Sequence, residues 1–246
     1  MSRHSGALRI FQYNWPVYAG TWLVALASLA SLHCFSGAQA WLLGSGALLA
    51  LLWSLVSLLV SLYVYDRSPL VAGRWVPGLL GPGVHHWAAV DAGLDAEVLL
   101  HGVLPGRCLG RLDIFDPAVM TSPAIARARA RTPREQPALA CPPTALTLAD
   151  ASCDAIVVAF TAHEIRDRDA RERFFGELRR ALLPGGKALI VEHLRDWPNF
   201  LAFGPGYLHF VARSEWLRLA AGAGLRVAAE TRVTPWVMAL TLERPQ

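Results

Sequence analysis

The distribution of apolar and polar positions divides the chain into two unlike parts. Residues 10–65 contain no Asp, Glu, Lys or Arg. This apolar stretch is interrupted once, at residues 33–39, which leaves two apolar segments at about 16–33 and 41–65. A helix needs roughly 17–25 apolar residues to cross a bilayer. The pattern therefore predicts a transmembrane helical hairpin over residues 1–65.

The residues that flank the two predicted spans indicate how the hairpin is oriented. Trp and Tyr lie near the ends of both segments, where aromatic side chains gather at membrane interfaces. Arg3 and Arg9 precede the first span, Arg67 and Arg74 follow the second, and the connecting loop has no basic residue. The positive-inside rule then places both termini and the following domain on the cytoplasmic side of the membrane. A buried helix pair in a soluble fold is the alternative.

Residues 66–90 are rich in Pro, Gly and aromatic residues. A backbone broken in this way cannot cross hydrocarbon, because its polar groups would lose their hydrogen bonds. We therefore expect an irregular linker that lies along the headgroup surface and connects the hairpin to a globular domain.

Residues 91–246 alternate short apolar runs with segments of helical periodicity. This alternation is typical of a parallel sheet covered by helices. The predicted strands are 111–116, 154–160, 187–192, 225–233 and 237–243, and the predicted helices begin at 122 or cover 169–183 and 213–223. The fold class is thus α/β, with an antiparallel pair of strands at its end.

The composition of the chain argues against nucleic-acid binding and against cysteine-based zinc sites. The chain has 23 basic and 19 acidic residues, and its basic residues are scattered, whereas nucleic-acid binding needs a basic stripe. Its four cysteines form no CxxC pair, which argues against a zinc ribbon or a disulfide framework and agrees with a reducing cytoplasm. Lys187 is the one lysine beside 22 arginines, and with the abundant Ala, Leu and Gly this indicates a GC-rich, bacterial genome.

Two sequence segments then show a family resemblance. LTLADASCDAIVVAFTAHEIRD (146–167) and FFGELRRALLPGGKALIVEH (174–193) resemble the second half of class I S-adenosylmethionine (SAM)-dependent methyltransferases, in the type 11 group that includes ubiquinone and menaquinone C-methyltransferases. The resemblance implies a Rossmann-like, mostly parallel sheet with an antiparallel last strand, and SAM as the cofactor. The family's glycine-rich loop, commonly D.G.G.G, is degenerate here and keeps only Asp91 and Gly93.

The same resemblance implies further cofactor contacts. Asp116 matches the acid that ends the second strand and accepts both ribose hydroxyls, with Asp113 as the alternative inside the strand. Asp150 matches the residue that contacts the adenine amino group; for both assignments a carboxylate that only caps a turn or loop is the alternative. Three neighbours complete the set: Ala151 beside Asp150, and Phe160 and Thr161 at the end of the fourth strand, where ligands gather in open α/β sheets.

Polar residues follow two neighbouring strands of the predicted sheet. His163 comes directly after the fourth strand, and Glu192 and His193 end the fifth, so we expect them in one crevice. Three interpretations stay open. His163 or His193, with Glu192, is a general base for the acceptor; His163, Glu192, His193 and His209 bind a divalent metal; or the set is a structural hydrogen-bonded network.

Residues 197–210 are unusually aromatic for a surface loop, and in the resembled family the corresponding region covers the substrate. Together with the hairpin, this segment predicts a membrane-anchored methyltransferase that transfers the SAM methyl group to a hydrophobic or lipid-like acceptor. Two alternatives remain: a non-catalytic membrane scaffold that keeps the fold, or a relative that uses the same cofactor, with a metal, for a different transfer. The sequence predicts no oligomeric state.

Overall fold

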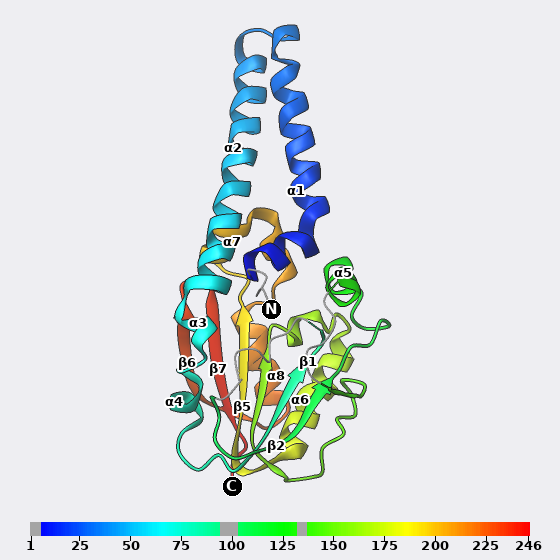
Figure 1. Ribbon diagram of the computed structural model, residues 1–246, viewed down its shortest axis with the longest axis vertical. Helices are drawn as coiled ribbons and strands as arrows, with labels where there is room; N and C mark the ends of the chain where they lie inside the picture. The colour runs from blue at the N-terminus through cyan, green and yellow to red at the C-terminus, as the bar shows by residue number, and fades with distance from the viewer. Residues whose placement is uncertain (1–5, 94–102, 132–136) are drawn as a thin grey trace.

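The computed structural model describes residues 6–93, 103–131 and 137–246. Two long antiparallel helices, α1 (Gly6–Ala30) and α2 (Gly37–Leu62), rise from one end of an α/β domain, as Figure 1 shows. A short 3-10 turn, η1 (Leu32–Cys34), joins them. The predicted helical hairpin is therefore present, with its connecting loop at the far end from the domain.

One helical run in the described chain, Gly37–Ala72, is long and apolar enough to cross a membrane by length and composition. Helix α1 does not meet this criterion, because its first half carries Gln12, Asn14 and Pro16. The second predicted segment thus meets the criterion of length and composition, and residues 16–33 do not.

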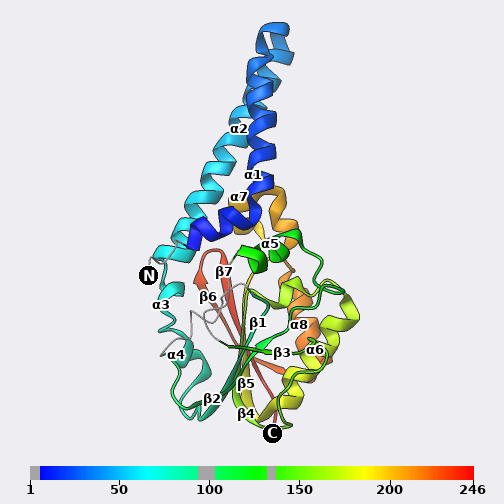
Figure 2. The same cartoon turned by 45° about the vertical axis from the view of Figure 1, so that its right-hand side comes forward.

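Helix α1 bends near its start, so that its first turns lie across the top of the domain (Figures 1 and 2). Pro16 lies inside the helix and has no N–H for the carbonyl of Gln12, four residues earlier. Arg131 of helix α5 (Pro123–Arg131) donates to that Gln12 carbonyl at 3.1 Å, and Arg127 donates to the Tyr13 carbonyl at 2.5 Å. The bend is therefore stabilised by the domain beneath it.

The domain contains a seven-stranded sheet of order β3-β2-β1-β4-β5-β7-β6 among the described residues. Its strands are β1 (His86–Asp91), β2 (Arg107–Asp113), β3 (Leu139–Ala140), β4 (Cys153–Ala159), β5 (Leu182–His193), β6 (Arg226–Thr234) and β7 (Val237–Glu243). Strand β7 runs antiparallel to both neighbours, and the other pairs are parallel. This confirms the Rossmann-like α/β prediction.

One face of the sheet is covered by helices α6 (Arg168–Ala181) and α8 (Arg213–Gly222). The Asp167 carboxylate caps α6 by accepting the Ala170 N–H at 2.7 Å, close to the predicted start at 169. Phe175 of α6 stacks on Trp216 of α8 with ring centroids 6.0 Å apart, and both are buried. These periodic apolar positions form the core that the sequence pattern predicts.

Residues 66–90 do not form the irregular linker along the headgroups that the sequence analysis predicts. They form α3 (Pro69–Ala72), α4 (Val76–Leu80) and all but the last residue of β1. Leu70, Val76 and Leu80 are buried in one cluster with Leu189 of β5 on the second sheet face. The Pro and Gly residues break the chain into short helices whose apolar side chains still find a sheet face to cover.

The hairpin joins the domain at the carboxyl ends of the parallel strands (Figure 1). Helix α2 continues into a π-helical turn, η2 (Tyr63–Arg67), and the Asp66 carboxylate there accepts the N–H groups of Gly6 and Ala7 at 2.6 and 2.9 Å. These are unsatisfied donors of the first turn of α1, so a residue at the end of the hairpin caps its beginning.

We predict that Asp66→Asn lowers the free energy of unfolding by about 1 kcal/mol, because the cap loses its charge at the helix N-terminus. Thermal unfolding of the full chain in detergent measures this. Glu172→Gln, at an exposed position of α6 beyond its first turn, is the control, because it removes a surface carboxylate that caps no helix. Equal midpoints for the two variants would contradict the cap.

Candidate functional site

The carboxyl end of β1 keeps the two residues expected from the degenerate glycine loop. Asp91 is the last residue of the strand, and its carboxylate accepts the N–H of Gly93. Gly93 has φ +95°, and a Cβ at this position would lie 2.8 Å from the Arg129 side chain. Glycine is therefore required here both by its backbone conformation and by the lack of space.

Asp113, and not Asp116, occupies the strand-end position of β2. Asp113 is the last residue of the strand and is buried. Asp116 lies three residues further on, where its carboxylate accepts the Ala118 N–H at 2.9 Å and closes a turn. Of the two ribose candidates, Asp113 has the location that the resemblance implies.

Arg129 of α5 lies between the ends of β1 and β2, and no pattern in the sequence predicts it. Its guanidinium binds both carboxylate oxygens of Asp113 at 2.9 Å and donates to the Ala92 carbonyl at 3.0 Å. It also lies over the Phe115 ring, 4.3 Å from the centroid. The carboxylate that would accept ribose hydroxyls is therefore paired with an arginine.

The predicted adenine contacts, Asp150 and Ala151, do not lie at the carboxyl edge. They precede β4, so they lie at the amino edge of the parallel strands, opposite the end where β1 and β2 carry Asp91 and Asp113. Asp150 is exposed and forms an ion pair with Arg180 at 2.5 Å. The residue that follows β3 at the carboxyl edge is the buried Cys141, whose N–H donates to the Asp113 carbonyl.

Phe160 and Thr161 follow β4 at the carboxyl edge, as predicted. Phe160 has φ +51°, which is uncommon for a residue other than glycine and is frequent at functional sites. Its ring lies 5.7 Å from Tyr65 and 5.4 Å from His193. Thr161 is buried, and its N–H donates to the Glu192 carboxylate at 3.0 Å.

His163 and Glu192 form a buried pair at the ends of β4 and β5. Nδ1 of His163 lies 2.7 Å from Glu192 Oε2, while Glu192 Oε1 accepts the N–H groups of Thr161 and His163. Burial alone would lower the pKa of His163, but the charge of Glu192 and hydrogen bonds to Glu164 and Glu192 outweigh it and raise that pKa from 6.5 to about 10. In this state His163 is a proton donor, and its use as a base requires loss of that proton.

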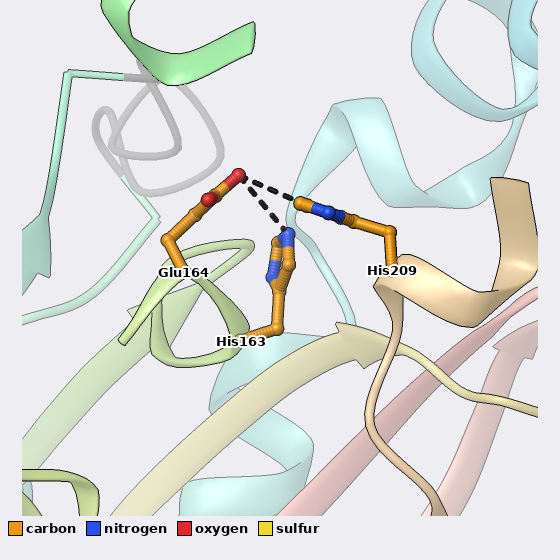
Figure 3. A group of neighbouring side chains, drawn as sticks. All are labelled: His163, Glu164 and His209. Atoms are coloured by element: carbon orange, nitrogen blue, oxygen red, sulfur yellow. Dashed lines mark hydrogen bonds and ion pairs between the residues drawn. The ribbon is translucent and has the colours of Figure 1, made fainter. Parts of the chain in front are cut away.

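Glu164 and His209 complete a polar cluster with His163 (Figure 3). Glu164 Oε1 lies 3.5 Å from His163 Nε2 and 3.2 Å from His209 Nε2. Burial raises the pKa of Glu164, but hydrogen bonds and charge from the two histidines hold it well below its ordinary value. Arg166 contacts the His209 ring and donates to the His209 carbonyl at 2.9 Å.

His193 lies apart from this cluster, which is a correction to its expected role as base or metal ligand. Its Nε2 accepts the Tyr65 hydroxyl at 2.7 Å, and its Nδ1 donates to the Trp236 carbonyl at 2.9 Å and faces Asn199 Oδ1 at 3.0 Å. Burial is the main cause that lowers its pKa from 6.5 to about 4. Because both nitrogens are engaged, His193 is a neutral link between the hairpin and the sheet.

Comparisons with known proteins agree with the fold. The type 11 family described as "Methyltransferase domain" matches residues 118–190, from just before α5 into β5. No curated protein matches the chain.

Solved structures share the fold. A SAM-dependent methyltransferase from Aquifex aeolicus is 19% identical, with a TM-score of 0.54 over 78% of this chain and 98% of that one. One from Methanosarcina mazei is 15% identical, with a TM-score of 0.50 over 69% and 97%. The pyocyanin biosynthetic protein PhzM is 14% identical, with a TM-score of 0.55 over 96% of this chain and 72% of PhzM.

The domain therefore has the Rossmann-like fold of class I methyltransferases. The family match and the shared fold support an enzyme of the SAM-dependent methyltransferase class, with SAM as its cofactor.

The residue types at the ends of β1 and β2 are those that a SAM site requires. Asp113 offers a carboxylate at a strand end, and Gly93 leaves room that any side chain would fill. Arg129 takes up that room, and because its side chain is about one-third exposed it has a path toward solvent. Asp113 is thus free to accept ribose hydroxyls only when its pair with Arg129 opens.

We predict that Asp113→Asn weakens SAM binding about 10- to 100-fold, because hydrogen bonds to a charged acceptor are lost. Arg129→Gln tightens binding about tenfold, because it removes the group that competes for the carboxylate. Equilibrium dialysis with the detergent-purified chain measures both. Asp116→Asn is the control and leaves the affinity unchanged; a loss at Asp116 and none at Asp113 would reverse the assignment.

We predict that acid destabilises the wild-type chain through His193. The unfolded chain takes up a proton on this imidazole below pH 6.5, whereas the folded chain takes it up only near pH 4. The stability is therefore full above pH 6.5 and falls as the pH drops toward 4, by about 3 kcal/mol in total.

Chemical unfolding at pH 7 and pH 5 measures this effect. His193→Gln has lower stability at pH 7 and a smaller loss between the two pH values, whereas His86→Gln, at an exposed position, keeps the wild-type loss. The same loss in wild type and His193→Gln would show that His193 does not carry it.

Proposed function

We propose that this protein is a membrane-anchored methyltransferase that transfers the methyl group of SAM to a hydrophobic, lipid-like acceptor at the cytoplasmic membrane. One observation carries the proposal: the base of the hairpin lies on the ligand edge of the sheet. Tyr65, at the end of α2, contacts Phe160 and hydrogen-bonds His193 at the ends of β4 and β5. A hairpin placed there brings a bilayer close to the candidate site.

The apolar surface of the hairpin continues onto the segment beside the site. Trp53 of α2 donates to the Leu201 carbonyl at 2.7 Å and packs on Phe200 of α7 (Trp197–Phe203), with ring centroids 5.3 Å apart. Trp197 is 73% exposed and Leu201 is 62% exposed. The large apolar side chains of the hairpin that are more than half exposed are Val17, Leu23, Val24, Leu26, Trp41, Leu42, Leu48, Leu49, Leu52, Leu55 and Leu59. A patch of this kind fits contact with lipid.

The charge distribution supports an orientation with the domain in the cytoplasm. Arg9 lies near the start of α1, and Arg67 and Arg74 follow α2, all at the domain end of the hairpin, whereas residues 10–65 carry no charge. Basic residues are retained on the cytoplasmic side of membranes. Both termini then lie on that side, and the tip of the hairpin points into or through the bilayer.

We assign the cofactor to the ends of β1 and β2, and the acceptor to the ends of β4 and β5. When bound, SAM supplies an activated methyl group on its sulfonium. Asp113 would accept the ribose hydroxyls, and Gly93 would allow the backbone to approach closely. His163, held by Glu192, lies at the ends of β4 and β5 and would orient the atom of the acceptor that receives the methyl group.

The experiment is a methylation assay with the full chain in detergent or nanodiscs, SAM labelled in its methyl group and a bacterial lipid extract. Label is expected in the organic phase. We predict that His163→Gln and Glu192→Gln keep SAM affinity within about threefold and lower the turnover about 100-fold or more.

His86→Gln is the matched control and keeps both properties. Full turnover in His163→Gln and Glu192→Gln would contradict the assignment of the pair to the acceptor side. Label only in water-soluble products would contradict a lipid-like acceptor.

A second candidate function is a non-catalytic membrane scaffold. The pairing of Arg129 with Asp113 favours it, because the pair already satisfies the strand-end carboxylate without a ligand. A scaffold would bind no SAM even as the Arg129→Gln variant, so the dialysis experiment above separates the two candidates.

A further inference from the structure

Three side chains with metal-binding atoms meet at the carboxyl edge of the sheet. His163 and Glu164 belong to η4 (Ala162–Glu164), directly after β4, and His209 ends η5 (Gly204–His209). One ligand atom from each lies within 4.8 Å of the other two (Figure 3). We propose that His163, Glu164 and His209 bind a divalent transition-metal ion of the zinc class.

The distances fit a tetrahedral site. Zinc lies about 2.0–2.1 Å from its nitrogen and oxygen ligands, which places neighbouring tetrahedral ligands about 3.3 Å apart. Glu164 Oε1 lies 3.5 Å from His163 Nε2 and 3.2 Å from His209 Nε2. The two imidazole rings lie nearly perpendicular, edge to face, with centroids 5.1 Å apart, and the three ligand atoms lie within 4.8 Å of one another.

A second observation, on the carboxylate of Glu164, points to a cation at this site. The other carboxylate oxygen, Glu164 Oε2, is buried and has no hydrogen-bond partner among the described residues, and Glu164 as a whole is 3% exposed. Buried carboxylate oxygens are nearly always satisfied, since leaving one unpaired costs free energy. A cation bound by both carboxylate oxygens of Glu164 would remove that cost.

Glu192 holds His163 in the orientation that a metal site requires. It binds Nδ1 of the imidazole, which leaves Nε2 directed at Glu164 and His209, and Nε2 releases its proton when it binds the ion. A carboxylate on the far nitrogen of a metal-bound histidine is the usual way to fix its tautomer. Glu192 is therefore a positioning residue here. His193 is no ligand because its nitrogens bind Tyr65 and Trp236.

Arg166 is the group that competes with the ion. Its guanidinium contacts the His209 ring, so it must turn away when a cation takes its place beside Glu164. His209 is about one-third exposed, which leaves an approach to the fourth position of the metal. Two imidazoles, one carboxylate and an open position are typical of a zinc site that takes water or a substrate oxygen.

The proposal requires neither SAM nor methyl transfer, so metal binding tests it directly. Chelator-treated full chain in detergent is dialysed against Zn²⁺, and we expect one Zn²⁺ per chain. Substitution with Co²⁺ is expected to give the intense visible absorption of a four-coordinate ion. Failure to bind zinc while SAM still binds would overturn this inference and leave the proposed function intact.

Four variants decide whether the ion lies at this site. Glu164→Gln and His209→Gln are expected to weaken Zn²⁺ binding at least about 100-fold, and Glu192→Gln about 10- to 100-fold. Arg166→Gln is expected to bind Zn²⁺ at least as tightly as the wild type.

His86→Gln, away from the cluster, is the control with unchanged affinity. His209 is partly exposed, so its variant decides the question even where Glu164→Gln does not fold. No stoichiometric binding by wild type and Arg166→Gln, or equal affinity in wild type and His209→Gln, would overturn the site.

Discussion

The hydrogen bond between Tyr65 and His193 is the interaction on which the arrangement of this molecule depends. It ties the end of α2 to the end of β5, and the other side of the His193 ring is held by the Trp236 carbonyl. Since this imidazole is buried and neutral, its two nitrogens have fixed and opposite roles. The hairpin is thereby placed over the carboxyl edge of the sheet, where open α/β folds bind their ligands.

A single helix, α5, connects the hairpin to the cofactor side of that edge. Arg131 and Arg127 hold the carbonyls of Gln12 and Tyr13 at the bend that Pro16 produces in α1, while Arg129 binds Asp113. The same short helix therefore contacts both the proposed membrane anchor and the strand-end carboxylate. At the degenerate glycine loop, the Arg129 side chain fills the space beside Gly93 and pairs with the carboxylate of Asp113.

Much of the fold was predictable because periodicity and strand-end chemistry are local properties of a sequence. The helix near 169–183, the closing strands, Gly93 and the neighbouring positions of His163 and Glu192 all follow from such patterns. Asp150 was assigned from a motif although the predicted strand 154–160 follows it, and in the structure it lies before β4, at the opposite, amino edge of the sheet. The pairing of Arg129 with Asp113 and the link from Tyr65 to His193 join residues distant in sequence, so no local pattern predicts them.

The proposed SAM site is the carboxyl edge of the sheet beneath the hairpin. Hydrogen exchange of the full chain in nanodiscs, with and without SAM, tests it most directly. With SAM, we expect slower exchange at residues 91–93 and 113–116, and no change at residues 149–153 on the opposite edge. Protection confined to residues 149–153, or no protection anywhere at saturating SAM, would contradict it.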